Sequence, residues 1–177
     1  SSSSSIRVLA VSRCSMPGAQ VAWVPAEPSI TIWHRRDRTQ GDPHSYSSGF
    51  NTLMSMSEGR PVFYAGVAVA PPTCYRYYDS VYTERYMRTP KENEKGYNDN
   101  PIERAGKQHG ALLLCHGVAD DNVHPQNTFE YAEALVQADK DFKEIWYTNR
   151  NHGIFGGNTR NHLLRQITDW FKTHLNK

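Results

Sequence analysis

Short apolar runs alternate with amphipathic segments over most of this sequence, and this order constrains the fold more than any other feature. Residues 66–70 and 111–115 are apolar runs of the length expected for buried strands, and residues 144–147 predict a third strand. Residues 128–138 and 159–175 instead carry apolar side chains at helical spacing. Strands that alternate with helices predict a mostly parallel sheet flanked by helices, so we expect an α/β fold.

The rest of the chain divides into an ordered and an irregular part. Residues 77–87 are aromatic and predict a helix, whereas residues 91–101 are rich in Asn, Glu and Gly and predict a polar loop. Before Phe50, Pro, Ser and Arg are scattered and the periodicity is poor. We therefore expect an irregular segment at 1–48 and a folded domain at 49–177.

Charge and hydropathy exclude two classes of partner. The 177 residues carry a net charge of +2, so we expect no strong attraction to nucleic acid. No stretch approaches the roughly 20 apolar residues that span a bilayer. The three cysteines, Cys14, Cys74 and Cys115, match neither a disulfide framework nor a zinc pattern. Cys115 follows three leucines, which favours a buried thiol over a reactive one.

Polar clusters follow the second and third predicted strands, at the sheet edge where ligand sites of parallel sheets lie. Asp120 and Asp121 follow the second strand on a turn opened by His116 and Gly117, and His152 follows the third. A carboxylate there can orient an imidazole that acts as a general base. The simpler alternatives are a solvated acidic turn and an exposed loop histidine. The order, acid before base, is that of α/β-hydrolases.

The nucleophile of such a fold should precede both residues, on a strand-to-helix elbow of G-x-S-x-G form. Residues 44–50 read HSYSSGF. Ser47 and Gly49 match the second half of the elbow, but Ser45 occupies the position of the first glycine. A glycine is needed there because the strained turn leaves no room for a side chain. Ser47 is therefore our candidate, and a polar serine-rich turn is the alternative.

A metal site is a second interpretation of the polar cluster after the second strand. His116, Asp120, Asp121 and His124 are metal ligands by residue type. Their spacing fits no helix-face pattern such as H-E-x-x-H, so we expect no metal and no cofactor.

Tyrosines gather between the first and second predicted strands. Because a tyrosine offers both a ring face and a hydroxyl, these residues can line a small apolar pocket. Packing in the core is the alternative, and periodicity alone favours it. The residues are Tyr75, Tyr77, Tyr78, Tyr82 and Tyr86.

Four motifs, GVAVAP, YYDSVYTERYM, HGVADDNVH and NRNHGIFGGNTRNHL, closely resemble the dipeptidyl peptidase IV-type branch of the prolyl oligopeptidase family. The resemblance runs in order from Gly49 to about Leu175. It implies the C-terminal part of an α/β-hydrolase domain that removes N-terminal dipeptides with proline or alanine in second position. The family joins this domain to a β-propeller, so we expect this chain to be a piece of a larger protein or poorly active alone.

The resemblance also implies roles for single residues. Asp120, the first aspartate of ADDNVH, matches the triad acid, and His152 matches the base. A flat apolar slot suits a proline ring, because the ring is rigid and brings no donor of its own. The residues that match this proline pocket are Tyr75, where relatives often carry tryptophan, Tyr78, Tyr82, Asn122 and Val123.

Partners and location follow from the resemblance alone. It implies peptide substrates and a homodimer formed through the hydrolase domain, with Trp146 and Tyr147 at positions that contact the partner subunit. A buried strand tryptophan is the alternative for Trp146. The residues themselves do not assign a compartment, and the resemblance suggests a periplasmic, secreted or cell-surface protein.

The elbow departs from the family pattern, which reads GWSYGGF or close to it. Three criteria give three candidates for the nucleophile. Alignment on Gly49 and Phe50 puts Tyr46 at its position. Alignment on the Ser-Tyr pair selects Ser45, and the G-x-S-x-G rule selects Ser47. We hypothesise a frame error, because residues 14–25, shifted by two bases, can encode LDARGTGGVGA, similar to a family segment upstream of the elbow.

The leading functional prediction is therefore a serine dipeptidyl peptidase. A non-catalytic relative that acts as a binding or assembly subunit is the rival, because the broken elbow favours it. An acylaminoacyl or tripeptidyl peptidase of the same family is a second alternative, but the YYDSVYTERY segment favours the dipeptidyl branch.

Overall fold

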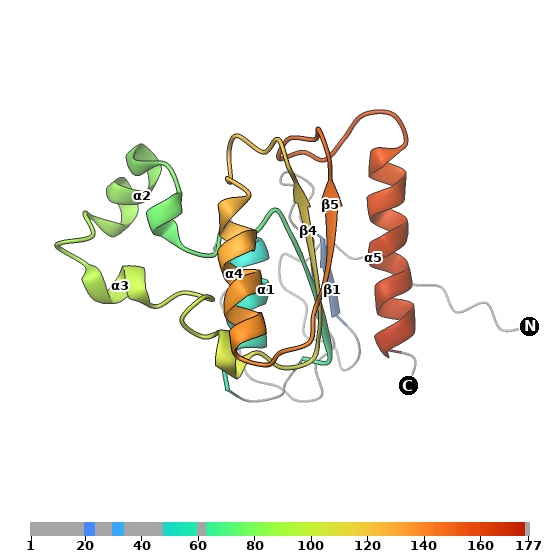
Figure 1. The fold of residues 1–177 in the computed structure, drawn as a ribbon, viewed down its shortest axis with the longest axis horizontal. Helices are drawn as coiled ribbons and strands as arrows, with labels where there is room; N and C mark the ends of the chain where they lie inside the picture. Colours follow the sequence, from blue (N-terminus) through green and yellow to red (C-terminus); the bar gives the residue numbers. More distant parts are fainter. Residues whose placement is uncertain (1–19, 24–29, 34–47, 60–62, 176–177) are drawn as a thin grey trace, which may run out of the picture.

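The computed structural model describes residues 20–23, 30–33, 48–59 and 63–175, and the account below is confined to them. A parallel three-stranded sheet in the order β3–β4–β5 lies at its centre (Figure 1). The strands are β3 (Ala65–Val69), β4 (Ala111–Gly117) and β5 (Lys143–Tyr147). The predicted α/β class is thus confirmed, with strand bounds that differ by at most two residues.

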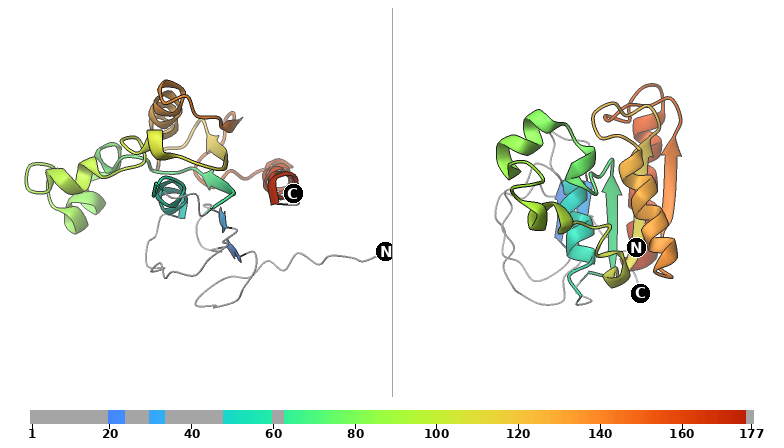
Figure 2. Two further views of the ribbon diagram at one scale, coloured as in Figure 1. Left: turned by 90° about the horizontal axis from the view of Figure 1, so that it is seen from below. Right: turned by 60° about the vertical axis from the view of Figure 1, so that its left-hand side comes forward.

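The sheet is covered by helices on both faces (Figures 1 and 2). Helices α1 (Ser48–Met56) and α4 (Gln126–Gln137) cover one face, and α5 (Thr159–Leu175) covers the other. Successive residues of a strand point to opposite faces, so β4 contributes to both cores. Leu112 and Leu114 pack on the α1 and α4 side, whereas Leu113 and Cys115 pack on the α5 side.

The strand β3 ends one residue earlier than predicted. Ala70 has a φ of 45°, a left-handed conformation that cannot continue a strand. Pro71 and Pro72 follow directly. The chain therefore leaves the sheet at its carboxyl edge, at the same end at which β4 and β5 finish.

A long excursion separates β3 from β4 and extends away from the sheet (Figure 2). Its predicted helix begins late, because Asp79 caps α2 (Ser80–Met87) by accepting a hydrogen bond from the Tyr82 amide at 3.0 Å. The predicted loop at 91–101 was wrong in part, since Asn93 caps a short helix there. The remaining elements are η1 (Tyr75–Tyr77), α3 (Glu94–Asn98) and η2 (Ala105–Lys107).

Two short strands lie within the segment that the sequence predicted to be irregular. Their backbones, β1 (Gln20–Trp23) and β2 (Ile30–Trp33), pair antiparallel. The rest of residues 1–47 lies outside the described residues, so the division into 1–48 and 49–177 stays a prediction. None of the described helices has the length and apolar character needed to cross a membrane.

Candidate active site

Asp120 lies on the loop that follows β4, with its side chain fully buried. Its Oδ1 accepts hydrogen bonds from the backbone amides of Asn122 at 3.0 Å and Val123 at 2.9 Å. Its Oδ2 accepts a hydrogen bond from Nδ1 of His152 at 2.9 Å. The structure therefore brings the predicted acid and base into direct contact.

His152 lies on the loop after β5, with 16% of its side chain exposed. Backbone hydrogen bonds join this loop to the one that carries Asp120: the Ala119 amide donates to the Arg150 carbonyl at 3.0 Å. Gly117 packs so closely that an added Cβ would lie 2.7 Å from the Asn151 carbonyl oxygen. Ile154, two residues after His152, is fully buried and has a φ of 46°. Burial of this side chain holds the loop in a backbone conformation that is unfavourable for isoleucine.

The surroundings of Asp120 favour its charged form. Burial alone raises the pKa of its carboxyl. Three effects lower the pKa: the hydrogen bonds from His116 and His152, the positive charge that His152 can carry, and the hydrogen bond from the Asn122 amide. Together they outweigh burial, so the pKa lies below its usual value. An anionic carboxylate at Nδ1 keeps the proton of the neutral imidazole on that nitrogen, so that Nε2 is the basic nitrogen, and it stabilises the imidazolium once it forms.

The other members of the polar cluster are arranged differently from a metal site. Asp121 and His124 are exposed, whereas Asp120 and His116 are buried and face each other. Among the described residues, no group of three His, Cys, Asp or Glu side chains could hold a metal ion. The structure also ranks the two aspartates, since Asp120 is the one in contact with His152.

Two of the predicted pocket residues contact each other beside Asp120. The Tyr78 hydroxyl donates to Oδ1 of Asn122 at 3.0 Å, which joins the tyrosine-rich segment to the acid loop. Tyr82 packs edge-on against Tyr78, with ring centroids 5.5 Å apart. Tyr75 packs against Phe50 at the start of α1, with centroids 5.0 Å apart. Val123 is buried, and its backbone amide donates a hydrogen bond to Asp120.

A buried clamp fixes the tyrosine-rich segment to the start of α4. Asn127 is fully buried, and its Oδ1 accepts a hydrogen bond from the Thr73 amide at 2.9 Å. The Thr73 hydroxyl donates to the Asn127 carbonyl at 2.7 Å, and the Asn127 amide group donates to the His124 carbonyl at 3.0 Å. The clamp therefore holds the segment and the acid loop in fixed relative positions.

Ser45, Tyr46 and Ser47 lie outside the described residues. The helix that follows them begins at Ser48 and is packed tightly against the end of β3, since a Cβ on Gly49 would lie 2.9 Å from Pro71. The chain therefore enters α1 at the sheet edge that carries Asp120.

Comparison with known proteins places this arrangement in a family. A profile of the prolyl oligopeptidase family, a family of serine peptidases, matches residues 44–177. The chain belongs to this family. The match includes both loops that carry Asp120 and His152, and it begins before the predicted elbow at 45–48.

Relatives within the prolyl oligopeptidase family are of the dipeptidyl peptidase 4 type. The chain is 38% identical to prolyl endopeptidase FAP of Mus musculus and 40% identical to dipeptidyl peptidase 4 of Bos taurus, each over 128 residues. A crystal structure of Porphyromonas gingivalis dipeptidyl peptidase 4 is 49% identical with a TM-score of 0.70, over 72% of this chain and 18% of that one. The chain spans 17% of the length of both curated relatives.

Sequence reasoning did not name Thr128 or Asn127 as site residues, and it named His116 only as the residue that opens the acid turn and as a possible metal ligand. His116, Thr128 and Asn127 are fully or almost fully buried, and each makes hydrogen bonds within or beside the site. A signal existed, because a histidine at the end of the apolar run ALLLC must find partners when it is buried. The partners themselves could not be read from the sequence.

Proposed function

We propose that this chain is the C-terminal part, at residues 49–177, of the hydrolase domain of a serine exopeptidase. The enzyme releases N-terminal dipeptides and prefers proline or alanine in second position. The contact between Asp120 and His152 carries the proposal, because an oriented imidazole beside a buried carboxylate is the base of a serine peptidase. Membership of the prolyl oligopeptidase family supports peptides as the substrates.

In the proposed reaction, Ser47 attacks the carbonyl carbon of the peptide, and Ser45 is the second choice for this role. His152 takes the serine proton at Nε2 and returns it to the leaving amine. Asp120 orients the imidazole and stabilises its cation. The backbone amide that follows the nucleophile donates to the oxyanion. The packing of Gly49 against Pro71 supports this geometry, because it brings the start of α1 to the edge of the sheet.

The side chain of the second substrate residue would lie against Tyr75, Tyr78 and Tyr82. Two observations support a slot of this kind. Tyr78 is tied to Asn122 beside the acid, and Phe50, three residues after Ser47, packs on Tyr75. An aromatic slot favours a rigid ring over a long polar side chain, because the slot gives the polar group no partner.

A fluorophosphonate probe tests the proposal. Active serine peptidases form a covalent bond to this probe through the nucleophile, and peptide mapping then identifies the serine. We expect labelling at Ser47 that disappears in the His152→Ala variant, while Ser45→Ala retains it. Folded wild-type protein that is not labelled would support the rival function, a binding or assembly subunit. That rival is favoured by Ser45, which occupies the position of the first glycine of the elbow.

We also propose that the hydrolase part forms a homodimer through the end of β5 and the start of α5. Trp146 and Tyr147 are on β5, and Tyr147 shares a hydrogen bond of 3.0 Å with His162 of α5. An open hollow of about 390 Å³ lies beside these three residues and Arg150. Sedimentation of wild type and Trp146→Glu tests this, and equal masses as monomers would contradict it.

Mapping the peptides that span residues 14–50 by mass spectrometry tests the frame-error hypothesis. Residues 14–25 fall largely outside the described residues. The written sequence found intact in an active enzyme would refute a frame error. Shifted peptides in that region would support it.

A further inference from the structure

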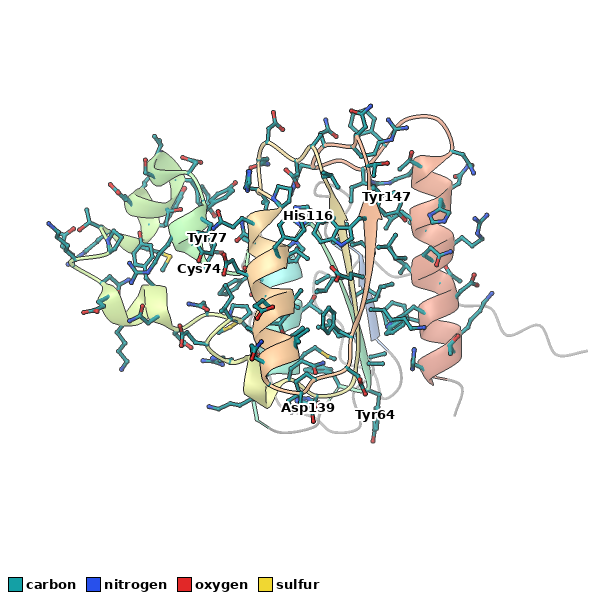
Figure 3. All side chains as sticks on the ribbon, in the orientation of Figure 1. Tyr64, Cys74, Tyr77, His116, Asp139 and Tyr147 are labelled. Atoms are coloured by element: carbon teal, nitrogen blue, oxygen red, sulfur yellow. The ribbon has the colours of Figure 1, made fainter. Side chains whose placement is uncertain are left out.

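A second histidine, besides the candidate base, contacts the candidate triad acid. His116 is fully buried at the end of β4, and its Nε2 lies 3.2 Å from Oδ2 of Asp120. This is the same oxygen that accepts the hydrogen bond from His152. Figure 3 shows His116 in the upper part of the sheet, where α4 covers it.

The ring of His116 is fixed by its other partners. Its Nε2 also lies 2.8 Å from the Val123 carbonyl oxygen, and its Nδ1 lies 2.7 Å from the Thr128 hydroxyl. Both partners of Nε2 are acceptors, so this nitrogen carries the proton, and Nδ1 accepts from the Thr128 hydroxyl. The Trp146 ring is stacked nearly parallel to it, at an interplanar angle of 16°.

His116 is a second donor beside Oδ2 of Asp120. The two backbone amides of the loop donate to Oδ1 of Asp120, and neither of them reaches Oδ2. Oδ2 is buried, and a buried carboxylate oxygen must keep a donor. His152 is on a partly exposed loop, whereas His116 is on a central strand between two others. A donor on a rigid element is the one suited to hold Oδ2 in place.

We propose that His116 is a positioning residue, which with Thr128 holds Oδ2 of Asp120 toward Nδ1 of His152 and so selects the tautomer of His152 that carries its proton on Nδ1. The proposal rests on the proposed function only in taking His152 as the base. The carboxylate selects the tautomer, and His116 keeps the carboxylate in position.

Nitrogen-15 NMR of the full chain labelled at histidine tests this without any turnover. In wild type, we expect neutral His152 to be predominantly the Nδ1–H form. In His116→Leu, the donor is lost at similar volume, and the Nε2–H form that free histidine prefers should become the major one. In His116→Gln, the amide nitrogen can donate from nearly the same place, so we expect the wild-type tautomer to be largely restored.

The matched control is His124→Leu, which removes an exposed histidine from the loop that carries Asp120 and should leave the His152 tautomer unchanged. If His116→Leu fails to fold, Thr128→Val takes its place, because it removes only the hydroxyl that fixes Nδ1. A clear rise of the Nε2–H form is then expected. Folded variants that keep the wild-type tautomer would overturn the proposal, and so would equal losses in the Leu and Gln variants.

Failure of the proposed function would look different. A chain that the fluorophosphonate probe does not label, but whose His152 changes tautomer as expected, would contradict the peptidase and retain the role of His116. A chain that the probe labels, but whose His152 keeps its tautomer when His116 is replaced, would support the peptidase and contradict the role of His116.

Discussion

Asp120 and His152 are 32 residues apart in the sequence, yet Oδ2 of Asp120 accepts a hydrogen bond from Nδ1 of His152 at 2.9 Å. Strands β4 and β5 are adjacent and parallel, so their carboxyl ends deliver the two loops to one edge of the sheet. The following expectations depend on this contact or on the packing that maintains it.

Replacement of Asp120 by Asn should leave the protein folded and remove most of the proposed peptidase activity. The Asn side chain keeps an oxygen for the Asn122 and Val123 amides, but it can present an NH₂ group to His152 and stabilise the wrong tautomer. Loss of about 10⁴-fold in turnover is typical for this change at a triad acid. Initial rates on a chromogenic dipeptide substrate measure it, with Asp121→Asn as the control, because Asp121 is exposed. Equal losses in both variants would contradict the assignment.

Stability should fall in acid because of Asp120. Its pKa in the folded protein lies below the ordinary value of 3.8, so the unfolded chain takes up the proton at a higher pH than the folded one does. The stabilisation is fully present above about pH 5 and is lost as the pH falls through 3.8 toward the folded-state pKa. Urea unfolding of wild type and Asp120→Asn at a series of pH values measures it. The two free energies of unfolding should converge in acid, and a constant difference would speak against a charged Asp120.

Gly117→Ala should separate the two loops of the site. The added methyl group would collide with the Arg150 and Asn151 carbonyl oxygens, which are backbone atoms and cannot rotate away. We expect a loss of about 1–3 kcal/mol in the free energy of unfolding, the usual cost of overpacking. Gly106→Ala is the matched control, since a Cβ there meets nothing within 4 Å. Similar urea midpoints for the two variants would show that the loops are not packed as described.

The Cys115 thiol should be unreactive in the native protein. Cys115 is fully buried in β4, and burial raises its pKa to about 12. Very little thiolate is therefore present at pH 8, and the reagent has no access to it. Iodoacetamide labelling followed by peptide mass analysis should modify Cys115 only after denaturant is added. Modification of the native protein at the rate of the unfolded chain would place this strand at the surface.

The sequence alone determined the main elements of the fold. The three strands and α5 were predicted within two residues, because apolar periodicity depends on local spacing along the chain. Helix starts were less accurate where a side-chain cap decided them: Asp79 delays α2, and Asn93 creates a short helix in a predicted loop. The order of acid and base was also visible, since each follows a predicted strand.

Only the tertiary structure decided which groups meet. It distinguished Asp120 from its neighbour Asp121 by burying one and exposing the other, although both follow the same strand. It also gave His116 its place between Asp120 and Thr128, residues from a loop and a helix. Such contacts depend on how strands align and helices pack across long separations in the chain, whereas local spacing fixes only the face on which a side chain lies.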